Sequence, residues 1–133
     1  MLSCILIHQA NTKNKRCKMD IQALTQQLRQ FAKDRDWEQF HSPKNLAMAL
    51  SVEASELLEH FQWLTEDQSS NLNPEKHDKV TEEVADVFLY LLRMSDQLGI
   101  NLLDAATKKV VKNAEKYPVE KVKGSSRKYS EYE

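Results

Sequence analysis

Two pairs of carboxylic acids are the residues of this sequence best suited to chemistry. Glu53 and Glu56 form the first pair, Glu83 and Asp86 form the second, and the members of each pair lie three positions apart. On a helix this spacing places both carboxylates on one face, with their Cβ atoms about 5–6 Å apart. Asp86 is directly followed by residues 87–92, the most apolar run of this part of the chain. We therefore expect this acid to be drawn toward an interior, where an unpaired charge is very costly.

Three kinds of partner could offset that cost. Lys or Arg side chains are one, but Arg93 is the only cation close to the second pair. Protonation is another, because mutual repulsion and burial both favour the neutral acid. The third is a divalent cation, since four carboxylates from two antiparallel helices make an all-oxygen site that suits Mg²⁺ or Mn²⁺ better than Zn²⁺. The alternative to all three is that both pairs lie on solvated helix faces, where such spacings are frequent.

Aromatic side chains accompany the acids. On a helix, His60 and Trp63 fall on the same side as the first acid pair, and Tyr90 falls between the members of the second. Rings beside a metal-binding acid cluster suit a flat ligand that carries phosphates, with the rings holding a base and the metal holding the phosphates. Trp37 and His41 precede the second helix and could line the same pocket. The alternative is that Trp63 and Tyr90 are core residues and that His41 is a loop or cap histidine.

Cap and spacing signals predict four long helices that would carry these residues. Asp20 can cap a first helix that runs to about residue 35, and Ser42 followed by proline opens a second helix to about residue 64. Asn73, also followed by proline, opens a third helix, which Gly99 should end. The fourth is expected over residues 102–116, residues 65–73 are expected as a polar connection, and residues 36–41 look irregular. The predicted fold is all-α, a four-helix bundle that a second subunit could complete.

Composition places the chain among ordinary globular proteins. It has 133 residues, a formal charge of −1, 29% charged residues and 41% hydrophobic residues, which suits a single domain. A nearly balanced charge gives no general field for nucleic acid or an anionic membrane, so neither partner is expected. Only two glycines are present, and no glycine-rich phosphate loop appears. If this protein handles a phosphate, it does so without a glycine cradle.

The first part of the chain reads as a separate piece. Residues 1–18 are expected to be a flexible extension, and the compact domain is expected over 19–133, with an extended tail from about 119. The apolar run at 2–7 is too short for a signal-peptide core or a membrane span, so we expect the cytoplasm. Cys4 and Cys17 both lie in this extension and support neither a disulfide framework nor a metal site.

The acid pattern, taken together with its flanking segments, resembles the MazG-like all-α nucleoside triphosphate pyrophosphohydrolases, and within them the dCTP pyrophosphatase branch. The first pair is followed, after residues 57–82, by the second. Segments similar to that branch are 35–46, 56–63, 86–91, 109–124 and the pair Lys128-Tyr129. MazG-like sequences often have two adjacent acids before the second member of the first pair, where this chain has Ala54 and Ser55. The doubled acid here is Glu82-Glu83, which favours the small dCTP-type branch and removes no ligand.

The resemblance implies a concrete reaction. It implies Mg²⁺-dependent hydrolysis of a (deoxy)nucleoside triphosphate between the α and β phosphates, with dCTP or a modified dCTP as the expected substrate and nucleotide-pool house-cleaning as the role. It also implies a homo-oligomer, a tetramer built as a dimer of dimers, in which each pocket is completed by a neighbouring subunit. The positions that match the family's metal ligands are Glu53, Glu56, Glu83 and Asp86. The positions that match its substrate pocket are Trp37, His41, Trp63, Tyr90, Lys109 and Asn113, with Lys128 and Tyr129 as weaker candidates.

The chemistry implied agrees with the residue types. Phosphoryl-type transfer needs positioning and charge neutralisation more than a covalent nucleophile, and a carboxylate beside the metal can orient the attacking water. Glu53 or Glu56 is expected to take that role. Two alternatives stay open at this point. One is a helical interaction protein whose acidic face binds a basic partner, and the other is a related pyrophosphohydrolase acting on another nucleotide, such as phosphoribosyl-ATP or dUTP.

Overall fold

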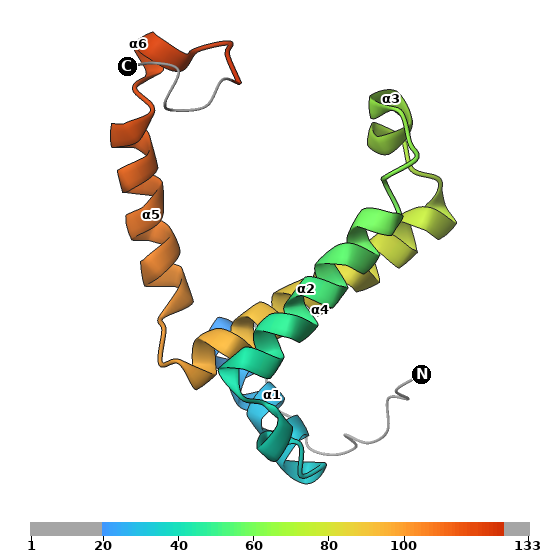
Figure 1. Ribbon diagram of the computed structural model, residues 1–133, viewed down its shortest axis with the longest axis vertical. Coiled ribbons are helices and arrows are strands. Elements are labelled where there is room, and N and C mark those ends of the chain that lie inside the picture. The colour runs from blue at the N-terminus through green and yellow to red at the C-terminus, as the bar shows by residue number, and fades with distance from the viewer. Residues whose placement is uncertain (1–19, 127–133) are drawn as a thin grey trace, which may run out of the picture.

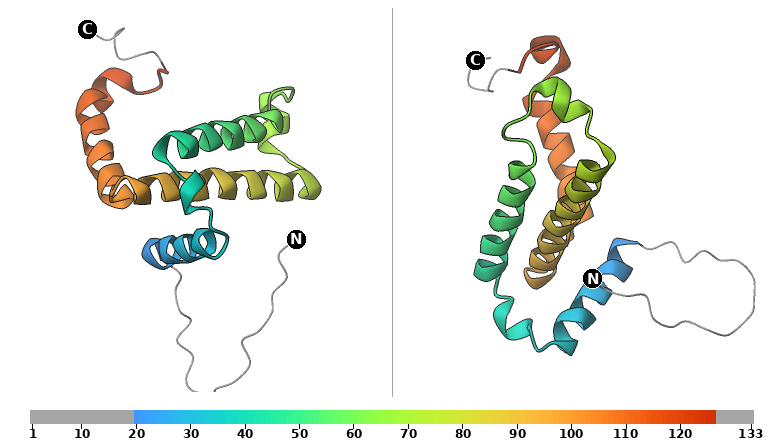
Figure 2. Two further views of the ribbon diagram at one scale, coloured as in Figure 1. Left: turned by 60° about the horizontal axis from the view of Figure 1, so that its bottom comes forward. Right: turned by 90° about the vertical axis from the view of Figure 1, so that its right-hand side faces the viewer.

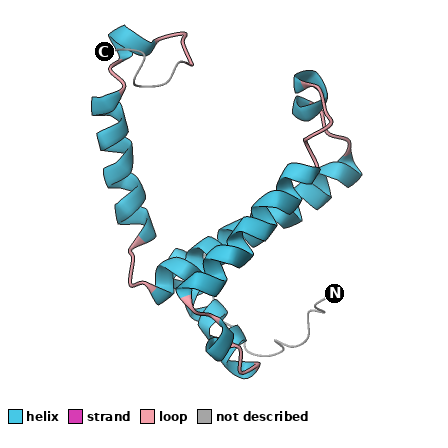
Figure 3. Ribbon diagram, viewed as in Figure 1, coloured by secondary structure: helices cyan, strands magenta, loops and turns pink. Residues whose placement is uncertain are grey.

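The computed structural model describes residues 20–126, and within that part of the chain it contains helices and no strands (Figure 3). The predicted all-α fold class is therefore confirmed. The helices are α1 (Ile21–Asp34), the 3-10 turn η1 (Glu38–Phe40), α2 (Pro43–Glu59), α3 (Glu66–Ser70), α4 (Pro74–Gln97), α5 (Leu102–Lys116) and α6 (Val119–Val122). None of them combines the length and the apolar character that crossing a membrane requires. The extension predicted over 1–18, with both cysteines, and the pair Lys128-Tyr129 lie outside the described residues.

The helices begin where the cap signals predict. Asp20, Ser42 and Asn73 each have an extended backbone, and each side chain accepts a hydrogen bond from the backbone N–H three residues further on. Pro43 and Pro74 occupy first-turn positions, where a missing N–H costs nothing. The third and fourth long helices, α4 and α5, agree closely with their expected ranges.

Three segments differ from expectation: the end of the second helix, residues 65–73 and the tail. The second helix, expected to reach residue 64, ends at Glu59, and tighter turns follow over residues 60–64. The reason lies just beyond, where Thr65 and Gln68 form a reciprocal capping box that starts α3 inside the segment expected to be a polar connection. The tail, expected to be extended from 119, instead begins with the single helical turn α6 after Pro118. The irregular segment 36–41 contains η1.

The helices form an open arrangement. α2 and α4 lie antiparallel and side by side, and α1 crosses the C-terminal half of α4 (Figures 1 and 2). Gly99, at a φ of 65°, takes the left-handed turn that follows α4, and α5 then leaves the pair and points away from it (Figure 1). Three of the four long helices therefore pack together within one chain, while the fourth stands apart.

The core of the described chain is small. The fully buried hydrophobic residues are Ala32, Leu46 and Leu92. Leu50 and Leu57 of α2, and Phe61 just after it, are only half-buried. Large apolar side chains are instead exposed on several helices, among them Met48, Val52, Leu58, Val84, Leu103, Val110 and Val111. So much exposed apolar surface is typical of a chain that packs against another copy or partner.

Candidate metal centre

Three carboxylates from two helices converge in the middle of the α2–α4 pair. Glu53 and Glu56 come from α2 and Glu83 comes from α4, and one oxygen atom of each lies within 4.8 Å of the others. The three-residue spacing puts both α2 acids on one face, and the antiparallel packing sets that face against α4. Glu53 and Glu83 are half-buried, while Glu56 is exposed.

The fourth predicted acid, Asp86, lies beside this trio without being part of it. It is exposed, one turn further along α4. Burial raises the pKa of Glu53, and the negative charges of Asp86, Glu56 and Glu83 raise it further. The charges of the other three acids therefore all act on Glu53, and Glu53, Glu56 and Glu83 are the three whose oxygen atoms approach within 4.8 Å of one another.

The acid cluster has no Lys or Arg partner among residues 20–126. No Lys or Arg forms an ion pair with any of its four carboxylates, and Glu83 Oε2 is buried with no hydrogen-bond partner. His60 Nε2 lies 4.0 Å from Glu83 Oε1, beyond hydrogen-bond distance. An unpartnered, buried carboxylate oxygen beside two other carboxylates is a donor set that a hard divalent cation satisfies, so the residues fit Mg²⁺ or Mn²⁺.

Tyr90 is the aromatic side chain that the structure brings to the acids. It is half-buried one turn after Asp86 on α4. Burial raises the pKa of the Tyr90 hydroxyl, and the charges of Glu53 and Asp86 raise it further, which places the phenol within their field. The two predicted tryptophans lie differently. Trp63 follows α2 and is 87% exposed, and Trp37 is 45% exposed and packs edge-to-face against Phe31, with ring centroids 5.8 Å apart.

His41 lies where η1 passes into α2, and it contacts α4. Its Nδ1 accepts a hydrogen bond of 3.3 Å from Arg93 Nε. Burial lowers the pKa of His41, and the charge of Arg93 lowers it further, whereas Glu38 opposes this shift. The histidine is therefore tied to the same helix as the acids Glu83 and Asp86, at a point closer to that helix's C-terminus.

The two predicted residues of the fourth helix lie away from the acids in this chain. Lys109 and Asn113 are exposed on α5, which diverges from the α2–α4 pair (Figure 1). Sequence spacing carries no information on the angle between α4 and α5, so it could not place these side chains.

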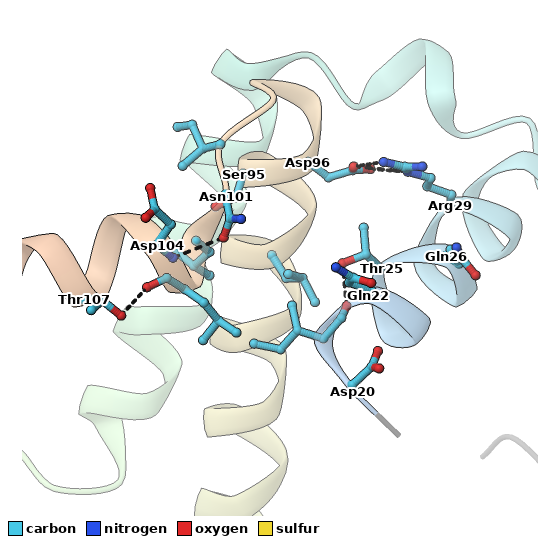
Figure 4. Close-up of a pocket in the computed structure, with 15 residues that line it drawn as sticks. Asp20, Gln22, Thr25, Gln26, Arg29, Ser95, Asp96, Asn101, Asp104 and Thr107 are labelled. Atoms are coloured by element: carbon cyan, nitrogen blue, oxygen red, sulfur yellow. Dashed lines mark hydrogen bonds and ion pairs between the residues drawn. The ribbon is translucent and has the colours of Figure 1, made fainter. Parts of the chain in front are cut away.

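An ion-pair network near the C-terminal end of α4 was not predicted. The side chains of Arg93 and Asp96 are only 6% and 8% exposed there, and Arg93 Nη1 donates to Asp96 Oδ2 at 3.0 Å. Arg29 of α1 reaches the same carboxylate, with Nε 2.8 Å from Oδ2 (Figure 4). The three-residue spacing of Arg93 and Asp96 inside an apolar helix was the available signal. Arg93, the cation considered for the acid cluster, is therefore engaged elsewhere.

A hollow of about 720 Å³ lies beside this network, between α1, the end of α4 and the start of α5 (Figure 4). Arg29 and Asp96 line it, together with apolar side chains such as Leu92 and Ile100. None of the acids or aromatic residues predicted for the functional site lines this hollow. The acid cluster is instead an open feature of the α2–α4 pair.

The fold and the paired acids agree with one known class of proteins. The chain belongs to the MazG-like family, whose profile matches residues 48–132. It is 39% identical over 104 residues to dCTP pyrophosphatase 1 of Homo sapiens and to that of Mus musculus, and 36% identical to that of Bos taurus. These alignments cover 77% of this chain and 61–62% of the relatives, so the chain spans less than two thirds of their length.

A solved structure has the same architecture. The crystal structure of a pyrophosphatase from Archaeoglobus fulgidus superposes with a TM-score of 0.71 at 39% sequence identity. The match covers 80% of this chain and 99% of the archaeal chain. The resemblance to MazG-like proteins that the sequence suggests is thus confirmed at the level of family and fold.

Proposed function

We propose that this protein is a Mg²⁺-dependent nucleoside triphosphate pyrophosphohydrolase that releases a nucleoside monophosphate and pyrophosphate. The observation that carries the proposal is the convergence of Glu53, Glu56 and Glu83 within 4.8 Å, with no Lys or Arg paired to them among residues 20–126. Membership in the MazG-like family and the names of its relatives support it. We take dCTP or a modified dCTP as the preferred substrate, because the curated relatives carry that name.

The residues have distinct roles in this proposal. The four acids Glu53, Glu56, Glu83 and Asp86 would hold the Mg²⁺, with Mn²⁺ as a substitute. Bound there, the ion would neutralise phosphate charge and polarise the phosphoryl group under attack. Either Glu53 or Glu56 orients the attacking water, since both project from the same face of α2 and a carboxylate can accept its proton.

The nucleoside would lie toward the C-terminal half of α4. Tyr90 follows the acids on that helix and His41 joins it one further turn along, so the phosphates and the base would occupy successive stretches of one face. Trp37 and Trp63 are assigned to the base and sugar. Trp63 follows α2 beside the N-terminal half of α4, on the other side of the acids from His41, so its exposed indole would cover the base of a site shared with another subunit.

We further propose a homo-oligomer, a dimer of dimers, in which subunits share each site. The three fully buried hydrophobic residues are too few to stabilise 107 described residues (20–126) alone, and α5 exposes Leu103, Val110 and Val111. Association would bury these side chains. It would also allow Lys109 and Asn113 of α5 to reach a site formed with another subunit, which their own α2–α4 pair does not offer. The cytoplasm, with a role in cleaning the nucleotide pool, is the setting we propose.

Pyrophosphate release from a panel of nucleotides tests the proposal. The panel contains the four common deoxynucleoside triphosphates, 5-methyl-dCTP, dUTP and phosphoribosyl-ATP, each with and without Mg²⁺. We expect Mg²⁺-dependent release that is fastest with dCTP or its modified form. The variants Glu53→Gln and Asp86→Asn should lose it, while Glu82→Gln, exposed beside the site, should keep it.

The outcomes separate the alternatives. Full activity in both Glu53→Gln and Asp86→Asn would show that the acids are misassigned. Activity confined to another nucleotide would keep the enzyme class and change the substrate. If no nucleotide is hydrolysed, and neither Mg²⁺ nor nucleotide changes the melting temperature, a helical interaction protein with an acidic partner-binding face becomes the better description.

A further inference from the structure

Arg93 is a buried arginine whose neighbours specify its orientation. Its side chain lies on α4 and the residue is only 5% exposed. Nη1 donates to Asp96 Oδ2 at 3.0 Å, and Arg29 from α1 binds the same carboxylate. The guanidinium is planar, so fixing it at Nη1 also fixes the direction of its Nε–H.

That Nε–H points at an imidazole. Arg93 Nε lies 3.3 Å from His41 Nδ1. A guanidinium can donate hydrogen bonds but cannot accept them, so Nδ1 must carry a lone pair and no proton. The proton of the neutral ring then resides on Nε2, for which no hydrogen bond is present within the described part of the chain.

The charges around His41 agree with a neutral ring. Arg93 faces it from α4 and Glu38 faces it from η1, and Asp96 balances Arg93 from one turn further along α4. Burial is the first cause of the lowered pKa of His41 and the Arg93 charge is the second, and Glu38 only partly opposes them. An imidazolium at this position would also direct an Nδ1–H against the Nε–H of Arg93.

Stability alone does not account for Arg93. Its Nη2 is buried and has no hydrogen-bond partner among residues 20–126. A buried charge with an unsatisfied donor is expensive, and an apolar side chain of similar volume is often as stable or more so. The arginine therefore has a cost in the folded protein that the contact with His41 explains.

On the basis of the function proposed above, we propose that Arg93 is a positioning residue, which fixes His41 as the neutral Nε2–H form so that the ring donates a hydrogen bond to an acceptor atom of the bound nucleotide. Arg93 lies seven residues after Asp86, a rise of about 10 Å along α4, with Tyr90 between them. Seven residues are two helical turns, so the acids and the His41 contact share one face. The acids at one end of that face would hold phosphates, and His41 at the other would meet an acceptor on the base or sugar.

Nitrogen NMR of the histidine rings tests this directly. In the full chain labelled with ¹⁵N, we expect His41 Nε2 to be protonated and Nδ1 to be an unprotonated acceptor at neutral pH. In Arg93→Met, which keeps an alkyl chain and leaves Asp96 with Arg29, the His41 titration midpoint should rise toward about 6.5, the ordinary value. Lys79→Met is the matched control, because it removes a positive charge from the exposed surface of the same helix, and it should leave the midpoint unchanged.

The wild-type spectrum tests the proposed protonation of His41 even if Arg93→Met fails to fold. A proton on His41 Nδ1 at neutral pH would overturn the proposal. An equal midpoint in wild type and a folded Arg93→Met would overturn it as well. A bare Nδ1 with a raised midpoint in the variant supports it.

Kinetics then separate positioning from a structural role. Loss of one oriented donor should raise KM for the preferred nucleotide by about three- to tenfold in Arg93→Met and leave kcat nearly unchanged. A fall in kcat at constant KM would mean that less enzyme is folded, and it would contradict the proposal. If the wild type hydrolyses no nucleotide, the proposed function fails and with it the donor role toward substrate. In that case the NMR result still shows whether the His41 proton lies on Nδ1 or on Nε2, and so whether Arg93 fixes the ring.

Discussion

Replacing Glu53 by Gln should make the metal-free protein more stable. Glu53 has an oxygen within 4.8 Å of oxygens of both Glu56 and Glu83. Two unit charges at that distance repel by about 1 kcal/mol at the dielectric constant of water and by about 3.5 kcal/mol at an effective value of about 20. The site is partly open and salt screens it, so we take the lower figure for each of the two pairs. The expected gain is about 1–2 kcal/mol in free energy of unfolding, or roughly 5–10 °C in melting temperature.

The pH dependence of this effect has a definite sign. The pKa of Glu53 is raised in the folded protein above its ordinary value of 4.5, so the folded state is favoured where Glu53 is protonated. That stability is present below the ordinary pKa and is lost as the pH rises through the raised value. Wild type should therefore approach Glu53→Gln in stability as the pH falls from neutral toward 4.5, and the difference should be largest at neutral pH and above.

Thermal melting in EDTA at several pH values measures both effects, and melting in millimolar Mg²⁺ measures the contribution of the ion. In EDTA, Glu53→Gln should melt above wild type, whereas Mg²⁺ should stabilise wild type more than the variant, because the variant has lost a ligand. Glu82→Gln, an exposed acid next to Glu83, is the matched control and should follow wild type in both buffers. A variant that melts below wild type in EDTA, or gains as much as wild type from Mg²⁺, would refute the reasoning that the acids repel one another around an ion site.

Three further perturbations address the packing and the ion pairs. Leu46→Ala should lower the free energy of unfolding in urea by about 2–4 kcal/mol, because the side chain is 1% exposed, and a loss below about 1 kcal/mol would contradict its place in the core. The pKa of Asp96 is lowered, first by its hydrogen bond from Arg29, so its contribution to stability is present above the ordinary pKa of 3.8 and lost as the pH falls through the lowered value. The midpoint of unfolding in urea, plotted against pH, should therefore fall less steeply at acid pH in Asp96→Asn than in wild type. An unchanged acid slope would argue against the ion pairs. Val110→Lys places a charge on the exposed apolar side of α5 and should reduce the molar mass measured by light scattering, whereas an unchanged mass would exclude this face from the subunit contact.

Local signals in the sequence were sufficient to predict where the long helices begin. Asp20, Ser42 and Asn73 are short polar side chains ahead of apolar periodicity, and their hydrogen bonds act within three residues. The end of α2 was harder to predict, because neither Gly nor Pro interrupts residues 57–65. The competing signal was the capping box that Thr65 forms with Gln68, and it lies beyond the helix it terminates.

The candidate site likewise has one part that the sequence could predict and one part that it could not. The side on which Glu53, Glu56 and Glu83 project follows from helical periodicity, so their convergence could be expected once α2 and α4 are paired antiparallel. The contact between Arg93 and His41 depends on how η1 turns back onto α4, fifty-two residues apart in sequence. No periodicity encodes such a contact, because it depends on tertiary packing.

The scarcity of fully buried apolar side chains has a consequence for how this protein unfolds. Ala32, Leu46 and Leu92 are the buried hydrophobic residues among residues 20–126, and with so small a core we expect folding and association to form a single equilibrium. The midpoint of unfolding must then shift with protein concentration, and dilution at a fixed temperature should be enough to unfold the chain. The melting temperature of this protein therefore depends on its concentration as well as on its sequence. The stabilities of variants can be compared only at the same chain concentration.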